Sequence, residues 1–212
     1  MICEQIMRTR FPKAHAEMTI LEAVKIMNDN RVRHLPICDE DNHLIGLVSE
    51  SDIRVLAATE IGKVEIDKVP IKNIMKTEII AGHPMDFVED IAFMLYELKI
   101  SCLPMVQDGK LIGMISETDL LRTLTELTGS TMPSSQIEIR IKNQLGMFSD
   151  IADIIAKRKT NIQNLLIYPD RENPEYQIIM LRVQLMNPAP LVEDLRANNY
   201  DVIWPKQVGL FL

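Results

Sequence analysis

Apolar residues at helical spacing occur twice in the first 127 residues, around Leu21–Met27 and around Ile91–Leu98. Because this spacing puts the apolar side chains on one face, each segment is predicted to form an amphipathic helix. Each is followed by a short apolar strand entered through a proline (Pro36, Pro104), a residue that suits a strand's first positions. A polar turn, a second apolar strand and a second helix complete each unit.

These two units are copies of one another. Leu35-Pro36 recurs as Leu103-Pro104, 68 positions later, and the Gly46 segment Leu-Ile-Gly-Leu-Val-Ser-Glu-Ser-Asp recurs as Leu-Ile-Gly-Met-Ile-Ser-Glu-Thr-Asp around Gly113, 67 positions later. The second copy is therefore one residue shorter between these two motifs. The missing residue falls in a polar turn, where an insertion or deletion costs little stability. A unit of about 60 residues buries too little surface to fold alone, so we expect the copies to pack together. We place them at residues 1–60 and 68–127, joined by a polar connector over residues 59–69.

The pattern changes after residue 127. A run rich in Gly, Ser and Pro (128–135) predicts a linker. The remainder predicts a third domain over residues 136–212, in the β-α-β-β-α-β order of ferredoxin-like folds. Its predicted elements are the strands 137–141, 162–168, 178–185 and 202–204 and the helices 148–155 and 191–197.

Composition and charge narrow the class of protein. Apolar residues make up 47% and charged residues 25%, which is typical of folded globular chains. The net charge is −7, and all of it falls in residues 1–135, which hold 14 basic and 21 acidic groups; residues 136–212 hold nine of each. With five Phe, four Tyr and one Trp, this balance argues against a general nucleic-acid binder. The sequence shows no signal-peptide pattern and no apolar stretch long enough to span a bilayer, so we expect no membrane association.

Three cysteines (Cys3, Cys38, Cys102) without a C-x-x-C spacing suit reduced thiols, and we expect a cytoplasmic protein. The four histidines form no metal-binding pair, and no nucleophile elbow or phosphate loop is present. We therefore expect neither catalysis nor a metal site.

The motif Gly-h-h-Ser-x-x-Asp, where h is apolar, ends at Asp52 in one copy and at Asp119 in the other. Its simplest interpretation is a helix cap, with Ser at the N-cap and an acidic third residue. A short carboxylate beside a helix N-terminus can also accept hydrogen bonds from the two hydroxyls of a ribose. Both interpretations stay open from the pattern alone.

Both motifs, Leu-Pro-h-h and Gly-h-h-Ser/Thr-x-x-Asp, match in both copies, and residues 1–127 therefore resemble a tandem pair of CBS domains, the Bateman module. The resemblance implies an adenine nucleotide (AMP, ADP or ATP) between the repeats, with Asp52 and Asp119 on the ribose. It also implies further site residues beside the ligand: Ser51, Thr118, Thr19, Arg33, His34, Pro36, Ile37, Ser101, Cys102 and Pro104.

The copies differ in charge. Residues 1–34 hold six basic and four acidic groups, whereas residues 71–104 hold three basic and five acidic groups. Thr19 opens the first long helix, where many family members place a phosphate-binding hydroxyl; the second copy has Asp86 in that region. Since carboxylates repel phosphate and Arg binds it bidentately, we expect one competent nucleotide site that uses the first copy's basic residues and one weaker or empty site. The alternative is that these arginines form a solvated face.

The third domain resembles an ACT domain, a module that often binds amino acids at a dimer interface. Its effector turn would include Asn143 and Gly146, although Leu145 replaces the family's Pro. Pairing of ACT modules without an effector is the preferred interpretation.

We therefore expect an α+β protein with tandem CBS repeats followed by a ferredoxin-like βαββαβ ACT domain. Its expected function is that of a homodimeric, non-enzymatic sensor acting on an unidentified protein partner; the alternative is a constitutive scaffold that binds no nucleotide. The domain order is similar to that of the bacterial acetoin-utilization family, which implies a link to acetoin catabolism.

Overall fold

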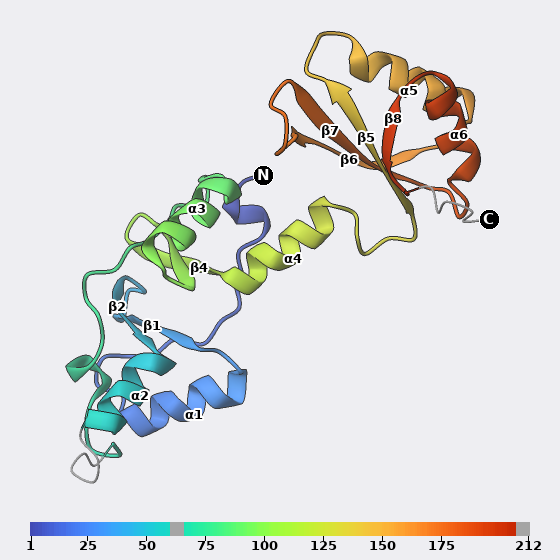
Figure 1. Ribbon diagram of the computed structural model, residues 1–212. Helices are drawn as coiled ribbons and strands as arrows, with labels where there is room; N and C mark the ends of the chain where they lie inside the picture. The colour runs from blue at the N-terminus through green and yellow to red at the C-terminus, as the bar shows by residue number, and fades with distance from the viewer. Residues whose placement is uncertain (60–65, 207–212) are drawn as a thin grey trace. The chain divides into compact units, whose positions relative to one another are not determined.

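The computed structural model describes residues 1–59 and 66–206, so most of the predicted connector and the last six residues of the predicted third domain lie outside the described residues. The chain divides into two compact units, Met1–Leu121 and Arg122–Leu212, with the boundary inside one helix. We describe each unit by itself (Figure 1).

The first unit contains the two repeats as far as Leu121, within the last helix of the second repeat, and each repeat has the predicted order of elements. In the first, helix α1 (Ile20–Asn30) precedes strands β1 (His34–Cys38) and β2 (Leu44–Ser49) and helix α2 (Glu50–Thr59). The second contains α3 (Val88–Leu98), β3 (Cys102–Gln107), β4 (Lys110–Ser116) and α4 (Glu117–Leu127). Each strand pair forms its own antiparallel two-stranded sheet.

Pro36 and Pro104 lie at the third residue of their strands, so the prediction that they open the strands is wrong by two residues. A proline fits at this position because its backbone N and O face the strand edge that points away from the paired strand. On that edge the Pro36 carbonyl accepts a hydrogen bond from the Ala14 N–H at 3.0 Å, and the Pro104 carbonyl accepts one from the Gly82 N–H at 2.9 Å. Since N and O of one residue face the same edge of a strand, the missing proline N–H removes no bond to the paired strand.

The leading segments of the two repeats are exchanged. Cys3, in the short helix η1 (Cys3–Gln5), is fully buried among α3, β3 and β4 of the second repeat. Ile71, its counterpart 68 positions later in η2 (Ile71–Asn73), is fully buried among α1, β1 and β2 of the first repeat. Neither repeat therefore completes its core with its own leading segment.

The exchanged segments continue onto the neighbouring strands. Arg8 and Met114 of β4 exchange two backbone hydrogen bonds of 2.9 and 3.0 Å, and Lys76 and Leu47 of β2 exchange two of 3.0 Å. A glycine allows each close approach: a Cβ on Gly113 would lie 2.5 Å from the Met7 sulfur, and one on Gly46 would clash with the Met75 sulfur. The two glycines of the repeated motif are therefore required by packing.

The second unit has the predicted β-α-β-β-α-β order. Its elements are β5 (Ser135–Lys142), α5 (Met147–Lys157), β6 (Ile162–Pro169), β7 (Tyr176–Val183), α6 (Ala189–Ala197) and β8 (Asp201–Trp204). The strands form one antiparallel sheet in the order β6-β7-β5-β8. Alternate residues of β5 (Ile137, Ile139, Ile141) pack with both helices in a single core, and both helices cover one face of the sheet (Figure 1).

Candidate functional site

The two Ser-x-x-Asp motifs lie at the N-termini of helices α2 and α4, where their side chains form capping hydrogen bonds. The Asp52 carboxylate accepts hydrogen bonds from the Ser49 N–H (2.8 Å) and hydroxyl (2.5 Å), and the Asp52 N–H donates to the Ser49 hydroxyl at 3.2 Å. The Asp119 carboxylate accepts the matching pair from Ser116 at 2.8 and 2.5 Å. The cap that the pattern predicts is therefore present in both repeats, and each carboxylate is held in one orientation by it.

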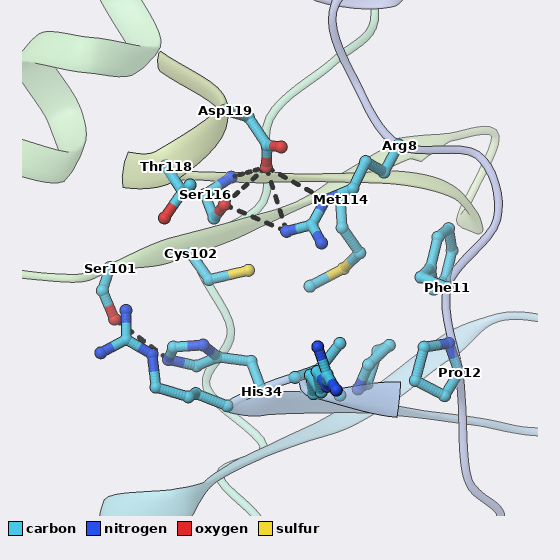
Figure 2. A pocket seen from close by; sticks show the side chains of 14 residues that line it. Arg8, Phe11, Pro12, His34, Ser101, Cys102, Met114, Ser116, Thr118 and Asp119 are labelled. Atoms are coloured by element: carbon cyan, nitrogen blue, oxygen red, sulfur yellow. Dashed lines mark hydrogen bonds and ion pairs between the residues drawn. The ribbon is translucent and has the colours of Figure 1, made fainter. Parts of the chain in front are cut away.

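Each of these carboxylates also lines a cavity of the first unit. The cavity that contains Asp119, here the Asp119 pocket, has a volume of about 200 Å³. Its lining comes from both repeats: Arg8, Phe11, Pro12, Arg31, Val32, Arg33, His34, Pro36, Ser101, Cys102, Met114, Ser116, Thr118 and Asp119. Figure 2 shows Asp119, Ser116 and Arg8 on one side of this space, with His34 and Pro12 across from them.

Arg8 is bound to Asp119 in this structure. Its Nη2 lies 3.1 Å from Asp119 Oδ2, its Nε donates to the same oxygen at 3.2 Å, and its Nη2 also donates to the Ser116 hydroxyl at 3.0 Å (Figure 2). The Asp119 side chain is 14% exposed and that of Arg8 is 47% exposed. The carboxylate thus lies at the wall of the pocket, whereas the guanidinium is partly in solvent.

The cavity that contains Asp52, here the Asp52 pocket, has a similar volume of about 220 Å³. It is lined by His34, Leu47, Ser49, Ser51, Asp52, Lys76, Glu78, Ile79, Ile80, Lys99, Ile100, Ser101 and Cys102. Lys76 binds the other oxygen of its carboxylate, with Nζ 2.9 Å from Asp52 Oδ1. Burial raises the pKa of Asp52, but the hydrogen bonds from Ser49 and Lys76 outweigh it, so that pKa lies below its ordinary value and the group is ionised.

The two pockets share a wall made by His34, Ser101 and Cys102. His34 Nε2 and the Ser101 hydroxyl are hydrogen-bonded at 3.1 Å across the two repeats. Burial lowers the pKa of His34, and neighbouring Arg33 lowers it further, so the imidazole is neutral at pH 7. Burial also raises the pKa of Cys102 to about 12, which keeps this thiol protonated and unreactive.

The two pockets have nearly equal volumes but differ in net charge. Three arginines and one aspartate line the Asp119 pocket, whereas two lysines, one aspartate and one glutamate line the Asp52 pocket. The first therefore has an excess of two positive charges and the second has none. An anionic group is attracted to the Asp119 pocket by this excess.

The structure brings most of the predicted site residues together. Asp119, Thr118, Arg33 and Pro36 line the Asp119 pocket, Asp52 and Ser51 line the Asp52 pocket, and His34, Ser101 and Cys102 line both.

Three predicted residues lie outside the linings of both pockets. Ile37 is fully buried in the core of the first repeat, and Pro104 contributes its carbonyl to the bond with Gly82. Thr19 caps α1 in a reciprocal box with Glu22: the Glu22 N–H donates to the Thr19 hydroxyl at 3.2 Å, and the Thr19 N–H donates to the Glu22 carboxylate at 2.9 Å. The Thr19 hydroxyl therefore caps the N-terminus of α1.

Sequence reasoning missed Arg8 and Lys76 as site residues. Both follow an Ile-Met pair, and they lie 68 positions apart, so the repeat itself carried the signal. Arg8, Arg31 and Arg33, which line the Asp119 pocket, belong to the six basic groups of residues 1–34, but only Arg33 was predicted individually as a site residue. The pattern did not indicate that these residues meet the second copy's Asp119.

The predicted effector turn of the second unit lies before α5. Gly146 has φ +86° at the N-cap of this helix, a backbone conformation that favours glycine, and the position where a Cβ would lie is open. The Asn143 N–H donates to the Glu175 carbonyl at 2.8 Å. These residues form a turn between strand and helix, and their role with an amino acid stays a prediction.

Within residues 1–59 and 66–206, no group of three His, Cys, Asp or Glu side chains could hold a metal ion. Over the same residues, no helix is both long and apolar enough to cross a membrane.

Two repeats that exchange their leading segments and enclose a pair of polar cavities define a tandem-repeat module. The chain belongs to the CBS domain family: the family model for the CBS domain matches residues 3–58 and 71–126, more than half of the chain.

Solved structures with a similar fold cover the repeat pair. The CBS domain pair of protein MJ0100, in complex with 5′-methylthioadenosine and S-adenosyl-L-methionine, is 28% identical, covers 59% of this chain and 97% of its own, and has a TM-score of 0.52. CBSX2 in complex with AMP is 25% identical, with 59% and 96% coverage and a TM-score of 0.53. The acetoin utilization protein AcuB from Vibrio cholerae is 28% identical, with 63% and 98% coverage and a TM-score of 0.55.

Among curated relatives, the homoserine O-acetyltransferase of Methanococcus vannielii is 33% identical over 125 residues, which are 58% of this chain and 25% of that protein. The chain spans a quarter or less of the first curated relatives that it matches. Most of each relative therefore lies outside the match.

Proposed function

We propose that this chain is a regulatory sensor that binds an adenine nucleotide (AMP, ADP or ATP) in the Asp119 pocket. The observation that carries the proposal is the combination, in one cavity, of an oriented carboxylate with three arginines. Asp119 accepts from the ribose hydroxyls, and Arg8, Arg31 and Arg33 bind the phosphates. Two similar CBS pairs were solved with adenosine-containing ligands, which supports the ligand class.

The Asp52 pocket is the weaker site for a phosphorylated ligand. Glu78 lies in its lining beside Asp52, and the two carboxylates cancel the charge of Lys76 and Lys99. A nucleotide that enters this pocket gains no net electrostatic attraction, whereas the Asp119 pocket offers an excess of two positive charges.

The sensor acts without catalysis, through a homodimer and a protein partner. Exposed apolar side chains on α2 and α4, Val55 at 62% and Leu121 at 63%, favour association of two copies through the repeat module. The β-α-β-β-α-β topology of the second unit supports an ACT-type pairing module, and similarity to AcuB supports a link to acetoin utilization. The compartment that we propose for this role is the cytoplasm. For regulation, the nucleotide must favour one packing of the repeats over another.

A constitutive scaffold is the alternative, and the capping hydrogen bonds at both helices favour it, because both aspartates have a structural role without any ligand. Thermal unfolding with AMP, ADP, ATP, S-adenosylmethionine or no ligand distinguishes the two. A ligand at 100 times its Kd stabilises the protein by about 2.7 kcal/mol. We expect this gain in the wild type and in Asp52→Ala, and its loss in Asp119→Ala.

Both variants lose one helix cap, at a cost of about 1 kcal/mol, so Asp52→Ala is the matched control for stability. If no nucleotide raises the unfolding temperature of the wild type, the scaffold is correct. If Asp52→Ala loses the gain and Asp119→Ala keeps it, the nucleotide binds in the other pocket.

A further inference from the structure

Arg8 has two possible anionic partners in one cavity. In the structure its guanidinium contacts Asp119 Oδ2, an oxygen that also accepts from the Ser116 N–H and hydroxyl. The same guanidinium lines the pocket that contains Arg31 and Arg33. A ligand hydroxyl that donates to Asp119 Oδ2 competes with Arg8 for this oxygen.

The backbone of Arg8 is fixed while its side chain is not. The two hydrogen bonds to Met114 hold Arg8 against β4. The side chain beyond this anchor is long and 47% exposed, so the guanidinium is already partly solvated, and an ion pair with a partly exposed member costs less to break than a buried one. The guanidinium can therefore leave Asp119 by rotation of side-chain torsions alone, with β4 unchanged.

We propose that Arg8 is a specificity-determining latch, which covers Asp119 in the empty protein and transfers to the phosphate of an entering nucleotide. A nucleoside without phosphate must displace Arg8 from Asp119 and offers no new anion in return. A phosphorylated nucleotide replaces the lost pair with a guanidinium–phosphate pair. The pocket thereby rejects nucleosides, since specificity is the difference between two affinities. This inference rests on the proposed function, because it assumes that the ribose binds Asp119.

Lys76 provides an internal comparison. It binds Asp52 at the repeat-equivalent position, but it is 66% exposed and its pocket has no excess positive charge. An ammonium also lacks the planar fork that binds phosphate bidentately. A substitution of Lys76 should therefore leave the preference of the Asp119 pocket unchanged.

Titration calorimetry of the full chain with AMP and with adenosine tests the latch in the wild type, Arg8→Met and Lys76→Met. In Arg8→Met we expect AMP to bind about tenfold more weakly, since a charge-assisted contact is lost. We expect adenosine to bind about two- to fivefold more tightly, since an exposed ion pair no longer competes. Lys76→Met should change neither constant at the AMP site.

Opposite changes for the two ligands would support the latch. Weaker AMP binding with unchanged adenosine binding would make Arg8 a simple phosphate ligand and would overturn the latch. Equal weakening of both ligands would assign Arg8 a structural role and also overturn it. Arg8→Lys, which keeps the charge, should retain part of the AMP preference and tests the latch if Arg8→Met fails to fold. A wild type that binds neither ligand would instead refute the proposed function.

Discussion

Arg8 Nη2 lies 3.1 Å from Asp119 Oδ2, although 111 residues separate the two positions. The matching ion pair joins Lys76 of the second repeat to Asp52 of the first, with Lys76 Nζ 2.9 Å from Asp52 Oδ1. Each cation therefore comes from one repeat and its carboxylate from the other. Both pockets depend on the exchange of leading segments, and a single repeat would build neither.

Gly113→Ala should destabilise the first unit by about 1–3 kcal/mol, because the new Cβ would meet Met7 Sδ at 2.5 Å and Cγ at 2.9 Å. Chemical denaturation of the wild type and the variant measures this loss.

The double variant Gly113→Ala/Met7→Ala should lose at least about 0.5 kcal/mol less than the sum of the single variants, since the clashing atoms are gone. Gly46→Ala with Met75→Ala is the equivalent pair in the other repeat. Strict additivity in both pairs would contradict the packing argument.

Ile71→Ala should loosen the first repeat, although residue 71 belongs to the second in sequence. Its side chain is fully buried against α1, β1 and β2, and truncation of a buried Ile costs about 2–5 kcal/mol. Amide hydrogen exchange should show faster exchange in β1 and β2 than in β3 and β4.

Cys3→Ala is the counterpart and should speed exchange mainly in β3 and β4, because Cys3 is buried in the core of the second repeat. Faster exchange in β1 and β2 with this variant would refute the exchanged arrangement.

The stability of the first unit should fall as the pH drops through 6.5. Burial, and then Arg33, lower the pKa of His34 from 6.5, so between the lowered pKa and 6.5 the unfolded chain binds more protons than the folded one. The stabilisation that neutral His34 contributes is therefore complete above pH 6.5 and is lost as the pH falls from 6.5 through the lowered pKa. Free energies of unfolding at pH 5.0 to 7.5 measure the slope.

His34→Gln keeps a hydrogen-bonding side chain opposite Ser101 and removes the titration. The difference between wild type and variant should therefore shrink as the pH falls below 6.5. A difference that is constant over this range would show that His34 does not contribute.

Gly146→Ala should cost about 1 kcal/mol in the second unit through backbone strain alone. The φ of +86° disfavours a side chain, yet open space surrounds the position. Gly146→Asn should cost less, because Asn tolerates the left-handed region better than Ala. Equal losses for Ala and Asn, measured by thermal unfolding, would contradict strain as the cause.

Local sequence signals predicted the repeats and the order of elements well. The Ser49 and Ser116 caps and the isoleucine alternation in β5 follow from residues three apart or two apart in the chain. The location of Pro36 was less predictable, because it depends on which strand edge carries Ala14.

The composition of each pocket depended on contacts far apart in sequence. Nothing near Asp119 indicates that Arg8 reaches it, since that contact arises from the pairing of Arg8 with Met114. Thr19 illustrates the opposite case: its hydroxyl was predicted to bind phosphate, whereas in the structure it caps α1 together with Glu22, three residues later in the chain. Local signals thus predicted secondary structure better than they predicted the cavity.

The burial of Cys3 among α3, β3 and β4 also bears on synthesis at the ribosome. The segment Met1–Arg8 is synthesised before its partner strand, because Met114, which binds Arg8, follows Arg8 by 106 positions. At about 5–20 residues per second, this segment waits at least several seconds for its partner. The first repeat can close as soon as Lys76 emerges, so the segment Met1–Arg8 reaches its binding position only after the first repeat is complete.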